Sequence, residues 1–287
     1  MNEGSQRVRE LLAAPGIVVL PGSYDAVSAR LMEHAGFDIV FTSGYSLAAS
    51  TLGMPDIGLL TASEVLDRVR NIAVAVSIPV IADMDTGYGN PLNVVRTVRE
   101  CVAAGVAGII LEDQEWPKKC GHMEGKRVIP REEHVQKIRA AVDARADSGL
   151  VLIGRTDARA VIGLDDAIER GKAFRDAGAD IVFVEARQSL EELQAVAKAI
   201  PDAPLFANMI EGGVTPVLTA AELEALGFKM VVFPLSPLYA AAAAVQDVAR
   251  RLKTTGTTAG STLLPFGAFN EIVDVPGWRE LEQEYVA

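Results

Sequence analysis

The 287-residue sequence lacks several features that would assign a protein to a familiar class. It has only two cysteines, Cys101 and Cys120, too few for a disulfide framework. No run approaches the roughly 18 consecutive apolar residues that span a bilayer. The charged and polar stretch 1–10 has no apolar core of the signal-peptide kind. These absences predict a soluble, cytoplasmic protein without a membrane partner.

Positive charge is also in deficit, because 27 Lys and Arg stand against 38 Asp and Glu, a net charge of −11. Nucleic acids and anionic membranes are bound by clusters of basic residues, so we expect neither as a partner. A small anionic substrate remains compatible, since a local pocket can be basic on an acidic protein. Among the three histidines, His34 and His134 lie in helical patterns and are expected to be surface or core residues rather than ligands.

The chain does contain a regular alternation of short apolar segments and longer amphipathic ones. The apolar segments are rich in Val and Ile, as expected of parallel strands covered on both faces; they are 17–20, 38–42, 79–82, 108–111, 150–154, 181–184, 205–207 and 230–233. The predicted helices are 25–35, 62–76, 91–104, 131–144, 164–177, 190–199, 220–226 and 237–253. Eight alternations without a break in composition favour one closed (β/α)₈ barrel over a doubly wound sheet.

We therefore expect a barrel over residues 1–253 and a helical extension over residues 254–287. The extension carries Phe266, Phe269, Trp278 and Tyr285, among other apolar groups. Exposing this much apolar surface to water is unfavourable, so the extension should pack on its own barrel or on the barrel of a neighbouring subunit. An oligomer is the expected form.

Function in such a barrel sits where the carboxyl ends of the strands converge. Carboxylates follow the third, fourth and sixth strands, and they would repel one another unless a cation lay between them. Oxygen ligands without much nitrogen or sulfur indicate Mg²⁺ or Mn²⁺ rather than Zn²⁺. Asp83 and Asp85 have strand spacing, which places both carboxylates on one side of the chain. The alternative is a solvated strand end with an Asp that caps a helix.

The most informative segment is the loop Lys118-Lys119-Cys120-Gly121-His122 after the fourth strand. A thiol beside two ammonium groups and an imidazole is expected to have a lowered pKa and an easily exchanged proton. The alternative is a surface loop with an incidental cysteine. Arg155 ends an apolar strand, where a buried cation is costly without an anionic partner. A substrate carboxylate could bind it bidentately; the alternative is a pair with Glu112 or Glu185.

Together these residues resemble the isocitrate lyase/phosphoenolpyruvate mutase superfamily. The resemblance covers nearly the whole chain, from Pro21-Gly22-Ser23-Tyr24-Asp25-Ala26 to Phe269-Asn270-Glu271. The 118–122 loop is similar to the signature of the lyase branch, whereas the mutase, phosphonopyruvate hydrolase and oxaloacetate decarboxylase branches lack its cysteine. The resemblance implies a homotetramer in which C-terminal helices are swapped between subunits.

The resemblance also implies the site. Mg²⁺ would be held through Asp83 and Asp85, with Asp56 and Glu112 nearby through water. The implied contacts to a small anionic dicarboxylate come from Ser43, Gly44, Tyr45, Gly121, His122, Arg155, Glu185, Asn208, Met209 and Ile210. Cys120 would act as the acid/base of a retro-Claisen cleavage, with His122 and Arg155 stabilising the developing charge. Glu112 and a metal-bound hydroxide are candidates for the base.

The substrate is expected to be a 2-hydroxy dicarboxylate of the 2- or 3-alkylmalate type. Methylisocitrate lyases use two further arginines for a third carboxylate, and the matching positions here are Tyr239 and Phe269, which cannot pair with an anion. The segments 116–123 and 208–213 are most similar to the petal death protein and 2,3-dimethylmalate lyase group. With Tyr45, these aromatic residues would give an apolar lining. The alternatives are a 2-methylisocitrate lyase, an oxaloacetate hydrolase giving oxalate and acetate, and a non-catalytic oligomeric scaffold.

Overall fold

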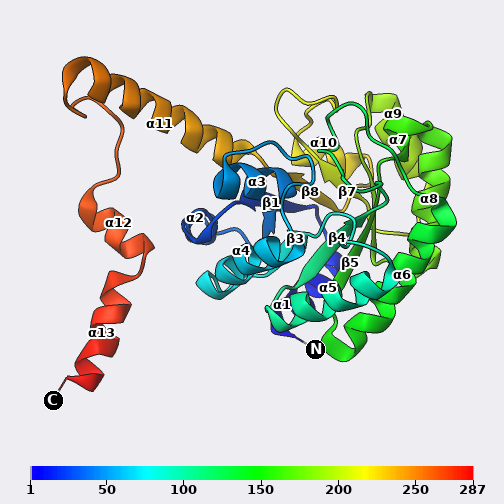
Figure 1. The fold of residues 1–287 in the computed structure, drawn as a ribbon, viewed down its shortest axis with the longest axis horizontal. Coiled ribbons are helices and arrows are strands. Elements are labelled where there is room, and N and C mark those ends of the chain that lie inside the picture. The colour runs from blue at the N-terminus through cyan, green and yellow to red at the C-terminus, as the bar shows by residue number, and fades with distance from the viewer. Residues whose placement is uncertain (1, 287) are drawn as a thin grey trace.

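Eight parallel strands form a nearly closed barrel in the computed structural model, which describes residues 2–286 (Figure 1). The strands are β1 (Val18–Ser23), β2 (Val40–Thr42), β3 (Val80–Asp83), β4 (Gly108–Glu112), β5 (Val151–Thr156), β6 (Ile181–Val184), β7 (Phe206–Asn208) and β8 (Met230–Phe233). Neighbours pair in the order β6-β5-β4-β3-β2-β1-β8-β7, and a single bridge between Val182 and Leu205 joins β6 to β7. The predicted (β/α)₈ fold is confirmed, with all eight strands close to their predicted positions.

The strand sequences are nearly all apolar because the side chains on both faces of the sheet are buried. Ile81, Ile110 and Phe183 point into the barrel and belong to its interior cluster. Val80 and Ile109 point outward and pack beneath the helices. Alternation along each strand therefore divides the core into an inner and an outer layer.

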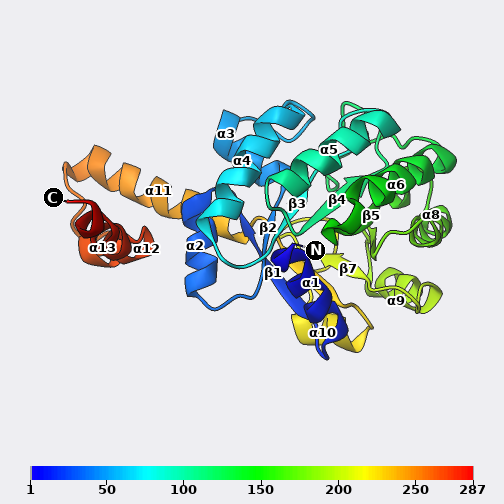
Figure 2. The same ribbon diagram turned by 90° about the horizontal axis from the view of Figure 1, so that it is seen from below.

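Helices cover the outside of the barrel (Figure 2). They are α2 (Ala26–His34), α3 (Gly44–Leu52), α4 (Ala62–Ala75), α5 (Pro91–Ala103), α6 (Arg131–Arg145), α7 (Ala158–Val161), α8 (Leu164–Asp176), α9 (Leu190–Ala199) and α10 (Ala220–Ala225). Helix α11 (Ser236–Thr255) follows β8 but projects away from the barrel and has no buried residue (Figures 1 and 2). Local sequence sets several of their starts: Thr61 and Glu64 form a capping box at α4, and Asn90 caps α5 ahead of Pro91. Helices α3 and α7 were not predicted.

Helix α1 (Glu3–Ala13) closes the amino-terminal end of the barrel. No helix was expected in this charged and polar stretch, but Asn2 caps it and Val8 reaches the interior cluster of the barrel. The Ser5 hydroxyl donates to the Ala107 carbonyl at 3.1 Å, immediately before β4. The helix thus plugs the end of the barrel opposite the carboxyl ends of the strands.

The C-terminal extension leaves the barrel along α11 and forms α12 (Phe266–Ile272) and α13 (Val275–Tyr285), which lie apart from the barrel in both views (Figures 1 and 2). Arg30 of α2 donates to the Ile272 carbonyl at 3.2 Å, and Ile272 is buried. Phe266, Trp278 and Tyr285 are 84%, 65% and 80% exposed. Packing of the extension on its own barrel therefore involves little of its apolar surface. Among residues 2–286, no helix combines the length and apolar composition that crossing a membrane requires.

Candidate active site

A small cavity lies at the carboxyl ends of the strands. Its lining includes most of the residues predicted from the strand ends and the 118–122 loop: Ser43, Tyr45, Asp56, Asp83, Cys120, Gly121, His122, Arg155, Glu185, Asn208 and Ile210. Three further predicted residues adjoin it, since the Gly44 amide faces Asp83, and Asp85 and Glu112 contact the lining residues Lys118 and Arg155. The structure thus brings these predicted site residues together, whereas Met209 does not line the cavity and packs in the outer core.

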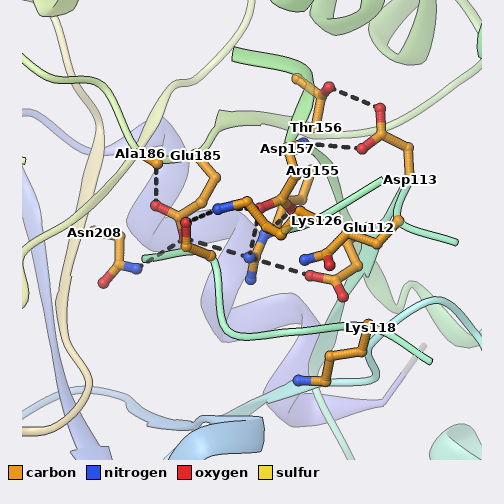
Figure 3. A network of polar contacts seen from close by, with 12 residues as sticks. Glu112, Asp113, Lys118, Lys126, Arg155, Thr156, Asp157, Glu185, Ala186 and Asn208 are labelled. Atoms are coloured by element: carbon orange, nitrogen blue, oxygen red, sulfur yellow. Dashed lines mark hydrogen bonds and ion pairs between the residues drawn. The ribbon is translucent and has the colours of Figure 1, made fainter. Parts of the chain in front are cut away.

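Arg155 is the central cation of the cavity, with carboxylates on several sides (Figure 3). Its guanidinium binds Asp157 bidentately, with Nε and Nη2 at 3.0 and 3.2 Å from the two carboxylate oxygens. Nη2 lies 3.1 Å from Glu112 and 3.5 Å from Glu185, and Nη1 lies 4.0 Å from Asp83. Burial alone would lower the pKa of Arg155, but these carboxylates hold it well above its ordinary value. Arg155 therefore stays charged in the cavity floor.

Glu185 is held in one position by two hydrogen-bond donors, with the His122 ring close by. It accepts from the Ala186 amide at 2.7 Å and from Asn208 Nδ2 at 3.0 Å, and His122 Nε2 lies 3.4 Å away. Burial would raise its pKa, but Arg155 and His122 lower it, so Glu185 is ionised. His122 Nδ1 accepts from the Val214 amide at 3.0 Å, which places the ring proton on Nε2, facing Glu185. The Asn208 carbonyl oxygen has no hydrogen-bond partner among residues 2–286, which leaves an acceptor available to a ligand.

Asp83 and Asp85 do not share a strand face as predicted. Strand β3 ends at Asp83, and Asp85 has a left-handed backbone with φ of 51°. The Asp83 carboxylate instead accepts from the Asp85 amide at 3.0 Å. Asp85 Oδ1 turns to Lys118 Nζ at 2.6 Å, and the same ammonium lies 2.7 Å from Asp56 Oδ1. The ammonium of Lys118, in the loop after β4, thus lies between Asp56 and Asp85.

The prediction of a lowered Cys120 pKa is wrong for this arrangement of the loop. Lys118 turns away to Asp56 and Asp85, and the Lys119 ammonium lies 3.4 Å from the Glu124 carbonyl at an exposed site. Burial raises the pKa of the Cys120 thiol to about 11. Residues adjacent in sequence point in different directions, so their charges do not act on the thiol. Cys120 therefore lines the cavity as a protonated thiol.

Gly121 allows the loop to lie directly on the cavity floor. A Cβ at this position would lie 2.5 Å from Cγ of Glu185 and 2.6 Å from Nη2 of Arg155. Any side chain at position 121 would collide with both charged groups, so only glycine lets the loop backbone lie this close to them. The Cys120 amide in turn donates to the Asp56 carbonyl at 3.0 Å, which ties the loop to the far side of the cavity.

Two tyrosines mark the mouth. The rings of Tyr45 and Tyr239 meet edge to face with centroids 6.5 Å apart, beside Cys120, Ile210 and Glu211. Phe269, predicted to join them, lies instead on α12 and lines neither this mouth nor the cavity in the described chain. The apolar lining contributed by this chain therefore rests on the tyrosines, Ile210 and Leu235.

Sequence reasoning assigned no role to several buried groups behind Arg155. Asp113 accepts from Thr156 Oγ1 at 2.7 Å, from the Asp157 amide at 2.9 Å and from Arg170 at 3.0 Å (Figure 3). Burial and the neighbouring Asp157 raise the pKa of Asp113 to about 6. Asp157 stood among the strand-end residues, but nothing in its sequence position showed that it binds Arg155 rather than a ligand.

The oxygen donors suit a hard divalent cation that keeps much of its water. Glu112 Oε1 is buried without a hydrogen-bond partner, and the Asp56 and Asp85 oxygens already stabilise a positive charge, that of Lys118. Within residues 2–286, no three His, Cys, Asp or Glu side chains form a metal cage on their own. Mg²⁺ typically binds through one or two carboxylates and several waters, so the residues present fit it.

Residues 8–253 match the phosphoenolpyruvate phosphomutase family. The chain belongs to the phosphoenolpyruvate mutase/isocitrate lyase superfamily. It is 48% identical to the 2,3-dimethylmalate lyase of Eubacterium barkeri over 97% of both chains. It is 44% identical to a 2-methylisocitrate lyase of Halalkalibacterium halodurans, over 89% of this chain and 84% of that protein. These relatives identify a carbon–carbon lyase of this superfamily.

Solved structures of the superfamily superpose closely on this fold. An oxaloacetate acetylhydrolase in complex with the inhibitor 3,3-difluorooxalacetate has a TM-score of 0.95 and 36% identity, over 98% of this chain and 97% of that one. A phosphonopyruvate hydrolase in complex with oxalate and Mg²⁺ has a TM-score of 0.90 and 33% identity, over 99% of both chains. The barrel and its C-terminal helices are thus shared with enzymes of several specificities.

Proposed function

We propose that this protein is a Mg²⁺-dependent lyase that cleaves a 2- or 3-alkylmalate into a 2-oxo acid and a carboxylic acid. The observation that carries the proposal is the position of the 118–122 loop. It places the Cys120 thiol in the same cavity as Arg155, Glu185 and the Asp83 carboxylate. One small substrate could therefore reach three kinds of group: a proton donor to carbon, a cation that binds a carboxylate, and the acidic residues of a cation site.

Binding and orientation of the substrate fall to groups that are already fixed. Arg155 keeps its charge and is the cavity cation suited to a substrate carboxylate, while Asn208 offers a free acceptor oxygen for a hydroxyl. His122 presents its Nε2 proton at the edge of the cavity. These donors are preorganised, so they stabilise the charge that develops on the departing carboxylate fragment without rearranging.

Proton transfer to carbon is assigned to Cys120. The hydroxyl proton passes to a base, the C2–C3 bond breaks, and its electron pair remains on C3 as a carboxylate enolate. Cys120 then gives its thiol proton to C3, and the base returns a proton to the sulfur through solvent. Glu112 is the candidate base among the residues of this chain. Bound Mg²⁺ would polarise the 2-hydroxyl and the C1 carboxylate, and Asp83 and Asp85, with Asp56 and Glu112 through water, are the residues that would hold it; Mn²⁺ suits the same oxygen set.

The preference for an alkyl substituent rests on the mouth of the cavity. Tyr45, Tyr239, Ile210 and Leu235 surround this region beside Cys120. These side chains carry no positive charge, so a third carboxylate would lose water there without gaining an ionic partner. The 48% identity to a 2,3-dimethylmalate lyase supports the same choice.

The proposal is tested by 2-oxo acid release from a panel of 2- and 3-alkylmalates, 2-methylisocitrate and isocitrate, with Mg²⁺ and then with chelator. We expect metal-dependent cleavage with an alkylmalate at the highest kcat/KM. More efficient cleavage of 2-methylisocitrate would keep the chemistry and overturn the substrate assignment. If no member of the panel were cleaved, the proposal would be wrong and the non-catalytic scaffold would become the better interpretation.

A second candidate is an oxaloacetate hydrolase, favoured by the close superposition on an oxaloacetate acetylhydrolase. The same cavity would then direct water at oxaloacetate and release oxalate and acetate. Oxalate formation from oxaloacetate, compared with alkylmalate cleavage under the same conditions, separates the two activities.

We also propose that the protein is a homotetramer whose C-terminal helices are exchanged between subunits. The support is the exposure of Phe266, Trp278 and Tyr285 on helices that lie apart from the barrel (Figure 1). Light scattering coupled to size exclusion gives the mass directly. A monomer would contradict this proposal.

A further inference from the structure

Lys126 is a buried cation that the proposed reaction does not use. It lies six residues after Cys120, and its side chain is only 3% exposed. Its ammonium donates to the Gly121 carbonyl and, at 3.2 Å, to the Met123 carbonyl. Both carbonyls belong to the turn that carries Cys120 and His122. A single buried ammonium thus holds this turn together from inside.

The carboxylate nearest to Lys126 is that of Asp157, which also binds Arg155. Asp157 Oδ1 lies 3.9 Å from Lys126 Nζ and accepts from Arg155 Nη2 at 3.2 Å (Figure 3). Its other oxygen accepts from Arg155 Nε at 3.0 Å. One carboxylate is therefore shared by the cation of the loop and the cation of the cavity floor.

Asp157 is itself fixed by the end of β5 and by α8. Its amide donates to Asp113 at 2.9 Å, and the adjacent Thr156 hydroxyl donates to the same carboxylate at 2.7 Å. Arg170 of α8 binds Asp113 at 3.0 Å from behind. The anchor to which Lys126 points is thus part of the barrel and does not belong to the loop.

We propose that Lys126 is a positioning residue that holds the Cys120 loop in register with Arg155 by bridging the Gly121 and Met123 carbonyls to Asp157. This inference rests on the proposed function, in which Cys120 and Arg155 act on one substrate. The distance between thiol and guanidinium is then set by two cations that share a carboxylate. Lys119, in the same loop, serves as the contrast because its ammonium reaches only the Glu124 carbonyl, at an exposed site.

The test is the rate at which iodoacetamide alkylates Cys120 without substrate, measured by mass spectrometry of the Cys120 peptide in Lys126→Met, Lys126→Arg and Lys119→Met proteins. Lys126→Met should raise the alkylation rate about ten-fold, because it removes a buried charge-assisted interaction that holds the loop on the cavity floor. Lys126→Arg keeps a cation that can donate to both carbonyls and should stay close to wild type. Lys119→Met removes the same charge from the loop and should not accelerate alkylation.

The kinetic arm uses an alkylmalate that the wild-type protein cleaves. Lys126→Met should lose kcat while KM changes little, because Arg155 keeps its partner Asp157; Lys126→Arg should restore kcat. A folded Lys126→Met protein, checked by circular dichroism and thermal unfolding, that is alkylated at the wild-type rate would overturn the inference. Equal acceleration in Lys119→Met would also overturn it, since it would reflect charge alone. Alkylation needs no substrate. A wild-type protein without lyase activity would therefore refute the proposed function, while the alkylation rates would still test the role of Lys126 in positioning the loop.

Discussion

Adding one methyl group at Gly121 is expected to separate the Cys120 loop from the floor of the cavity. In Gly121→Ala the new Cβ would lie 2.5 and 2.8 Å from Cγ and Cδ of Glu185 and 2.6 Å from Nη2 of Arg155. Neither side chain can retreat, because Asp157 holds Arg155 bidentately and Asn208 holds Glu185. The loop must therefore withdraw by roughly 1 Å to restore van der Waals contact.

The magnitude follows from the cost of overpacking a buried contact, about 1–3 kcal/mol. If the reaction takes place only with the loop in the described position, this cost is added to the barrier. At about 1.36 kcal/mol for each factor of ten, kcat/KM should fall about 5- to 150-fold. The melting temperature should change little, since an open loop relieves the clash.

The assay is 2-oxo acid release from the best alkylmalate, alongside thermal unfolding. Val74→Ala is the control, because Val74 on α4 is 80% exposed and does not line the cavity. That protein should keep wild-type kcat/KM. A folded Gly121→Ala protein with wild-type kcat/KM would refute the reasoning, because the loop position described here could not then be the reactive one.

Three further results are expected. Cys120→Ser should reduce kcat about 10²–10⁴-fold, the usual contribution of a general acid, while calorimetric Mn²⁺ binding persists; near-wild-type turnover would exclude the assigned role. Tyr239→Arg puts a cation at the mouth and should shift the preference toward 2-methylisocitrate over an alkylmalate, measured as the ratio of their kcat/KM values, about ten-fold; an unchanged ratio would show that Tyr239 does not select the substrate. Burial lowers the pKa of His134 from 6.5 to about 3, so the unfolded chain binds the extra proton between these values and stability falls as pH falls. Between pH 7 and pH 5 this effect lowers the free energy of unfolding by about 2 kcal/mol. In urea unfolding, the free energy of unfolding of His134→Leu should therefore fall by about 2 kcal/mol less than that of the wild-type protein over this range. The same pH dependence in both proteins would disprove the prediction.

The fold could be predicted because each strand carries its signal locally. Both faces of the strands are buried, so Val and Ile runs mark them directly, and glycines after Ala35, Ala104 and Ala177 mark where helices stop. Helix α1 was missed because only Val8 and its apolar neighbours reach the barrel, while its other faces are polar. Its Asn2 cap was the available signal.

The position of the site also followed from the sequence, since strand-end residues must meet at one edge of a barrel. The partners within the site did not follow. Lys118 and Lys119 adjoin Cys120 in sequence, yet their ammonium groups point to other partners and the thiol pKa rises. The pairing of Lys126 with Asp157 joins residues 31 positions apart and depends on how the loop folds back. Side-chain direction, which spacing does not encode in loops, decides these contacts.

The helix that plugs the barrel has a consequence for how the two products depart. Phe41, Ile110 and Phe206 line the bottom of the cavity, and α1 covers the barrel end beneath this packed interior, so both fragments of the proposed reaction would leave past Tyr45 and Tyr239. Cys120, which serves the carboxylic acid fragment in the proposed reaction, lines both the cavity and its mouth, whereas Asp83, on the side of the 2-oxo acid, lines only the cavity. If the proposed reaction holds, the carboxylic acid should leave first and the 2-oxo acid second, so the closed end of the barrel would impose an order on product release.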